Sequence, residues 1–138
     1  MSGQEERERI TSLIRDAMVS YPSLRVAYLY GSFLSRDDFR DIDIGLLASE
    51  QVSREDSLAF ASRVADTLEK ALGFQYECDV RVINFEPVWF QYEVISTGRA
   101  VVVRDENERI DFETRVLIEY QDLKFMYDLF DREYLARA

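Results

Sequence analysis

The sequence lacks histidine altogether and has one cysteine, two prolines and two lysines in 138 residues. Without histidine, Ser-His catalysis and histidine zinc sites are excluded. The lone Cys78 cannot form a disulfide framework, and we interpret it as a core side chain on an alternating strand. No apolar run approaches the ~18 residues of a membrane span, and no cleavable signal begins the chain. We therefore expect a cytoplasmic protein that does not bind membranes.

Positive charge is also scarce, because 17 lysine and arginine residues stand against 27 aspartate and glutamate residues, for a formal net charge of −10. Such a surface repels phosphate backbones, which argues against bulk nucleic-acid binding, and it can steer the chain toward a basic protein partner. Hydrophobic residues make up 47% of the chain. A chain of this size buries roughly 68% of its unfolded surface without disulfides or structural metal. The length predicts one domain.

One stretch joins a Gly-Ser turn to the end of a predicted strand. Residues 26–30 form an apolar, β-favouring run, and Gly31 and Ser32 follow it directly. Glycine lets a phosphate group approach the main chain, and serine offers it a hydroxyl and an N–H. A spacer of eight residues then leads to a second predicted strand.

The second strand carries two aspartates at alternate positions. Asp41 and Asp43 therefore share one face, where a hard divalent cation can bind. An EF-hand calcium loop is excluded, because Gly45 and Val52 stand where oxygen ligands belong. A third carboxylate, Asp79, lies on a later β-like run, on the face opposite its apolar neighbours. Three carboxylates on strands suggest a two-metal site.

The Gly-Ser turn, the spacer, the Asp-x-Asp pair and the later strand aspartate together resemble the nucleotidyltransferase superfamily related to DNA polymerase β. Over residues 1–138 the chain looks like a single minimal nucleotidyltransferase domain, most similar to the antitoxins that pair with HEPN-domain ribonuclease toxins. This resemblance implies an α/β (α+β) fold, with a mixed sheet flanked by helices and a long C-terminal helix. The spacer is shorter than is usual in these antitoxins, and Ser35, with Arg36 beside it, stands where they often carry arginine.

The resemblance also implies a site and a reaction. Asp41, Asp43 and Asp79 would be the catalytic and metal-binding residues and would hold two Mg²⁺ ions, with Asp79 as the nearest base. Gly31 and Ser32 would bind the β and γ phosphates of a nucleoside triphosphate, expected to be ATP. The acceptor would be a tyrosine hydroxyl of a partner HEPN toxin, and its adenylylation would block the ribonuclease.

Two alternatives remain open at this stage. Transfer to a small molecule, as in aminoglycoside-modifying relatives, conflicts with the short chain, which leaves no room for an acceptor-binding domain. A catalytically weak or inactive antitoxin of the same fold, which neutralises its partner by binding alone, is the alternative from a different class.

Periodicity and breakers predict the remaining elements. Ser2 and Glu5 form a predicted capping box for a helix that Pro22 ends, and Ser53 with Asp56 caps a helix that Gly73 ends. The predicted strands cover residues 25–30, 42–47, 75–83 and 100–103, and further helices cover residues 87–97 and 107 to the C-terminus.

The last predicted helix carries an unusually aromatic stripe at spacings of three and four. Its members are Phe112, Val116, Tyr120, Leu123, Tyr127, Phe130 and Tyr134. Packing within the chain is our first interpretation of this stripe, as it is of Trp89, Phe90 and Tyr92 on the helix before it. The alternative is a seam for a partner helix or a second copy, that is, a hetero-oligomer or homo-oligomer through the C-terminal helix.

Overall fold

The structure is a computed structural model that describes residues 3–137, so the predicted capping residue Ser2 lies outside the described residues. Its elements, in chain order, are α1 (Gly3–Met18), β1 (Leu24–Tyr30), α2 (Ser32–Ser35), β2 (Asp41–Ala48), α3 (Arg54–Ala71), β3 (Glu77–Val82), the 3-10 turn η1 (Ile83–Phe85), α4 (Val88–Thr97), β4 (Arg99–Val103) and α5 (Glu106–Arg137). This is the predicted α+β fold with a long C-terminal helix.

The four strands form one mixed sheet in the order β3-β2-β1-β4. β1 is antiparallel to both of its neighbours, and β2 and β3 are parallel. A parallel pair needs a long crossover, and the 18-residue helix α3 supplies it. The crossover brings the start of β3 beside the start of β2.

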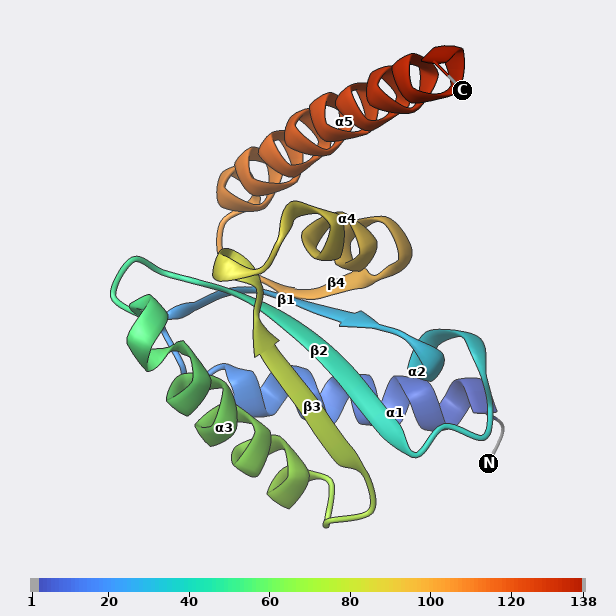
Figure 1. The fold of residues 1–138 in the computed structure, drawn as a ribbon. Helices are drawn as coiled ribbons and strands as arrows, with labels where there is room; N and C mark the ends of the chain where they lie inside the picture. Colours follow the sequence, from blue (N-terminus) through green and yellow to red (C-terminus); the bar gives the residue numbers. More distant parts are fainter. Residues whose placement is uncertain (1–2, 138) are drawn as a thin grey trace.

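Helices cover the two faces of the sheet unequally. Figure 1 shows α1 and α3 on one face, and α4 with the first part of α5 on the other. The α1/α3 face buries the larger core, which includes Ile10, Ile14, Ala27, Leu29, Ile42, Ile44, Phe60, Val64 and Leu68. The smaller core under α4 and α5 contains Val26, Tyr28, Ile83, Val94, Phe112 and Val116. On that second face the outward residues of β3 stay exposed.

The predicted helix ends are mostly confirmed. The Ser53 side chain accepts a hydrogen bond from the Asp56 N–H at 3.2 Å, and Gly73 ends α3 with φ +65°. The first helix ends at Met18, earlier than Pro22 predicts. At this end, the Arg104 guanidinium donates to the Met18 carbonyl at 2.9 Å and to the carbonyls of Val19 and Tyr21 in the turn that follows. A residue more than 80 positions later in the chain thus satisfies carbonyl groups at the end of this helix.

α5 is packed against the body over its first part. Phe112 and Val116 are buried in the core under α4, and the ring of Tyr120 stacks on Tyr92 with 3.7 Å between centroids. For these residues, packing within the chain is confirmed. Figure 1 shows that the rest of α5 extends away from the sheet and from α4.

The second part of the aromatic stripe does not pack within the chain. Tyr127, Phe130 and Tyr134 are 62%, 67% and 68% exposed. The interpretation of the whole stripe as internal packing is therefore wrong for this part, because α4 has only ten residues and ends before them. Trp89, at 60% exposed, also differs from the prediction. Within residues 3–137, no helix is both long and apolar enough to cross a membrane.

Candidate active site

The structure brings two of the three predicted aspartates directly side by side. In the parallel register of β2 and β3, Asp43 is opposite Asp79, and Asp41 is opposite Glu77. Cys78 faces the larger core, so Asp79 points to the other face of the sheet, as predicted. The carboxylates therefore lie on the α4 face, at the ends of β2 and β3 where the chain enters both strands.

Gly31 touches this group of carboxylates. It follows the last residue of β1, and its backbone has φ +78° and ψ −156°, a combination that is essentially restricted to glycine. A Cβ atom at this position would lie 2.3 Å from Asp43 Oδ2. The glycine is thus required both by the backbone and by the space that Asp43 occupies. The Gly-Ser turn and the Asp-x-Asp pair, separated by the spacer, meet in the fold.

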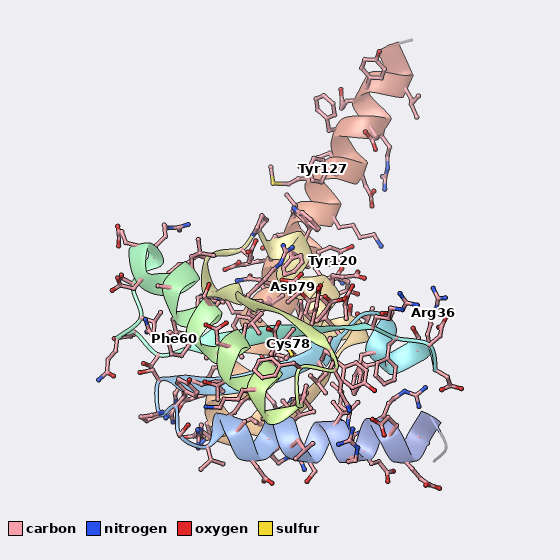
Figure 2. The ribbon with its side chains drawn as sticks, turned by 90° about the horizontal axis from the view of Figure 1, so that it is seen from below. Arg36, Phe60, Cys78, Asp79, Tyr120 and Tyr127 are labelled. Carbon is pink, nitrogen blue, oxygen red and sulfur yellow. The ribbon has the colours of Figure 1, made fainter. Side chains whose placement is uncertain are left out.

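Ser32 and Arg36 stand at the two ends of the short helix α2. Ser32 is its first residue and is partly exposed beside Gly31. Arg36 follows the helix, and its guanidinium binds the Asp38 carboxylate through two hydrogen bonds of 3.0 Å. In Figure 2 Arg36 lies beside α2, well away from Asp79. Arg36 therefore does not contact the Asp41, Asp43 and Asp79 carboxylates.

Burial and the negative charge of the site shift the pKa of Asp43. Burial, followed by the Asp79 and Asp41 carboxylates, raises the pKa of Asp43 above its usual value, and the Arg81 guanidinium opposes this rise. Arg81 Nε lies 3.6 Å from Asp79 Oδ1. The arginine is therefore the cation that partly balances the site in this structure.

An aromatic pair stands behind the carboxylates. Tyr30, the last residue of β1, meets Phe90 of α4 edge to face, with 6.0 Å between ring centroids. Arg81 stacks over the same Phe90 ring, 5.4 Å from its centroid. Burial raises the pKa of Tyr30 to about 12, and the nearby Asp43 and Asp79 carboxylates add to the rise. Tyr30 therefore stays protonated at neutral pH.

A pocket of about 440 Å³ opens at the site. It is lined by Asp41, Asp43, Glu69, Glu77, Cys78 and Asp79. Within residues 3–137, no three His, Cys, Asp or Glu side chains are arranged as a ready metal site.

Several residues of the site were not selected from the sequence. Arg81 follows Asp79 by two strand positions, so the alternation of β3 was a sufficient signal for it. Glu77 lies on the same face for the same reason. Glu69 and Tyr30 come from other elements, and no local pattern indicates them. The Cys78 interpretation is confirmed, because the side chain is buried and burial raises its pKa to about 12.

Comparison with known proteins identifies the family. A family profile described as "Polymerase beta, Nucleotidyltransferase" matches residues 13–107, which include the Gly-Ser turn and all three aspartates. The chain belongs to this nucleotidyltransferase family. A search of curated protein sequences finds no match. The family match confirms the family predicted from the sequence, and the structure confirms the predicted fold.

Solved structures of toxin–antitoxin complexes contain chains of similar fold. A chain of the MntA–HepT toxin–antitoxin complex matches with 20% identity and a TM-score of 0.62, over 96% of this chain and 98% of that one. A chain from the complex of a tri-AMPylated Shewanella oneidensis HEPN toxin with MNT antitoxin matches with the same identity, coverage and TM-score. A toxin–antitoxin structure with AMP-PNP matches with 21% identity and a TM-score of 0.64, over 94% and 98%. At this level of identity the likeness establishes the fold.

Proposed function

We propose that this nucleotidyltransferase transfers adenylate from ATP to a tyrosine hydroxyl of a HEPN-family toxin and so acts as its cytoplasmic antitoxin. The observation that carries the proposal is the meeting of Gly31 with Asp43, opposite Asp79, in a member of the family. Chains of similar fold come from a complex of a tri-AMPylated HEPN toxin with MNT antitoxin and from a toxin–antitoxin structure with AMP-PNP, an ATP analogue. Those complexes suggest the donor and the acceptor.

The donor set suits magnesium. Carboxylate oxygens are the ligands that Mg²⁺ prefers. Burial raises the pKa of Asp43, and the neighbouring Asp79 and Asp41 carboxylates add to the rise with negative charge that a divalent cation would offset. We assign Asp41, Asp43 and Asp79 to hold two ions. When bound, the ions supply charge stabilisation at the phosphoryl group and at the leaving oxygen.

The chain's own residues bind the donor and accept a proton. Gly31 and Ser32 are assigned to the β and γ phosphates, because the main chain at Gly31 is free of a side chain and Ser32 is partly exposed beside it. The acceptor oxygen forms a bond to the α-phosphorus, and the bond from that phosphorus to its bridging oxygen breaks. Pyrophosphate leaves with the electron pair, and the hydroxyl proton passes to a carboxylate, which we assign to Asp79.

The test is the intact mass of the partner. The purified chain is incubated with Mg²⁺, with each nucleoside triphosphate in turn, and with the HEPN-family protein encoded beside it. We expect the partner to gain one or more adenylates with ATP. Asp41→Asn combined with Asp43→Asn should reduce the rate by at least ~1,000-fold, since several kcal/mol of charge stabilisation are lost.

A matched control separates chemistry from general loss of charge. Asp16→Asn combined with Asp66→Asn changes two exposed helix carboxylates that do not line the pocket and should leave the rate unchanged. Unchanged transfer by a folded Asp41→Asn, Asp43→Asn variant would overturn the metal assignment. If that variant transfers nothing and still neutralises the toxin, the antitoxin works by binding alone.

A further inference from the structure

The distal segment of α5, residues 117–136, carries a large exposed apolar surface. Its large side chains with at least 45% exposure are Leu117, Ile118, Phe125, Met126, Tyr127, Leu129, Phe130, Tyr134 and Leu135. The segment is about 30 Å long at 1.5 Å per residue. Figure 2 shows Tyr127 clear of the rest of the molecule, whereas Tyr120 lies against the body.

The apolar side chains are not confined to one stripe. Tyr127, Phe130 and Tyr134 continue the stripe that is buried nearer the start of α5. Phe125 precedes Tyr127 by two residues and so points about 160° away from it around the helix. Leu129 follows Phe125 by four residues and lies on the same face as Phe125. A helix that is apolar on several sides is normally buried, and one that extends alone into water is marginally stable. The distal segment therefore has the character of an element that is enclosed by another molecule.

The charges of the segment indicate what encloses it. Residues 117–136 contain five carboxylates, at Glu119, Asp122, Asp128, Asp131 and Glu133, against two cations, at Lys124 and Arg132. A second copy of the chain would bring the same excess, within a protein whose formal net charge is −10. Like charges disfavour self-association, whereas a basic partner complements them.

The position of α5 points to the same partner as the active site. α5 stands on the face of the sheet opposite α1 and α3 (Figure 1), which is the face that carries the Asp43 and Asp79 carboxylates. We propose that the distal segment inserts into an apolar groove, edged by basic residues, of the protein that supplies the acceptor hydroxyl. This inference rests on the proposed function, since it takes the partner to be the HEPN-family toxin.

The aromatic side chains are the anchors of this contact. Tyrosine and phenylalanine bury much area at small entropic cost, and a few such residues carry most of the affinity of an interface. The test uses Tyr127→Ser combined with Phe130→Ser in the full chain, because Tyr120 also holds α5 to Tyr92 and would confuse stability with binding. The matched control is Val19→Ser combined with Leu58→Ser, which removes two exposed apolar side chains at 63% and 78% exposure on the α1/α3 side.

Binding is measured by calorimetric titration with the HEPN-family protein encoded beside the chain. We expect the Tyr127→Ser, Phe130→Ser variant to bind at least ~100-fold more weakly and the control variant to bind within about twofold of the unmodified chain. Affinity should also fall as salt is raised. Unchanged affinity of the aromatic variant would overturn the proposal.

Two further measurements separate the possible failures. The chain alone should sediment as a monomer at tens of micromolar. If it sediments instead as a dimer, and the Tyr127→Ser, Phe130→Ser variant as a monomer, a second copy of the chain is the occupant. The Asp41→Asn, Asp43→Asn variant should bind the partner as the unmodified chain does. Binding without any adenylate transfer by the unmodified chain would refute the proposed chemistry and leave the docking surface standing.

Discussion

Replacing Gly31 by alanine tests the central contact of the site. The backbone at Gly31 has φ +78° and ψ −156°. A non-glycine residue held in such a region costs of order 1–3 kcal/mol. The new Cβ atom would also lie 2.3 Å from Asp43 Oδ2, so the carboxylate has to rotate away. We expect Gly31→Ala to lower the free energy of unfolding by about 2 kcal/mol and to abolish adenylate transfer.

Gly73 provides a matched control for the backbone part of this effect. It also has a positive φ, +65°, but a Cβ atom there would meet nothing within 4 Å. Gly73→Ala should therefore cost about 1 kcal/mol of stability and leave adenylate transfer intact. Urea or thermal unfolding measures both changes, at roughly 3–5 °C of melting temperature per kcal/mol for a chain of this length.

A double-mutant cycle isolates the contact with Asp43. In an Asp43→Ala background the crowded carboxylate is absent, so Gly31→Ala should cost about 0.5–1.5 kcal/mol less than it does in the unmodified chain. Equal costs in the two backgrounds would mean that Gly31 and Asp43 do not touch. A Gly31→Ala variant as stable and as active as the unmodified chain would refute the reasoning altogether.

Three further outcomes follow from the charges and burial of the site. Because the pKa of Asp43 is raised in the folded state, its ionised form destabilises the fold at neutral pH. Asp43→Asn should therefore raise the melting temperature at pH 7, and this gain should vanish below about pH 3.9, where the carboxyl is protonated in the unfolded chain too. Arg81→Gln should raise the pKa of Asp43 further, seen by NMR titration, and should move the acid limb of the transfer rate to higher pH. Cys78, with a pKa of about 12, should react with a thiol reagent at neutral pH at least ~100-fold more slowly in the folded chain than in urea.

The faces of the strands were predictable because they are local. A side chain on a strand alternates with its neighbours whatever the rest of the chain does, so Asp41 and Asp43 share a face, and Asp79 lies opposite Cys78. The same rule would have selected Arg81. The metal and nucleotide assignments of these residues remain proposals.

Contacts between distant elements were not predictable in the same way. The register that sets Asp43 opposite Asp79 depends on how α3 crosses between the strands. The sequence of either strand alone does not predict this register. Arg104 binds carbonyl groups at the end of α1 that lie 83 to 86 residues earlier in the chain. The placement of Tyr30 and Glu69 beside the carboxylates likewise comes from packing between elements rather than from a local pattern.

The aromatic stripe of α5 shows a different limit of sequence patterns. Spacings of three and four identify which side chains share a face, but they are identical whether the face packs on the same chain or on another molecule. What decides is length: α4 ends after ten residues, whereas α5 continues for 32. The distal segment of α5 extends from the face of the sheet that carries the Asp43 and Asp79 carboxylates. Under the proposal, a partner held there is brought to the face on which its hydroxyl would have to be presented, which would couple binding and chemistry through one helix.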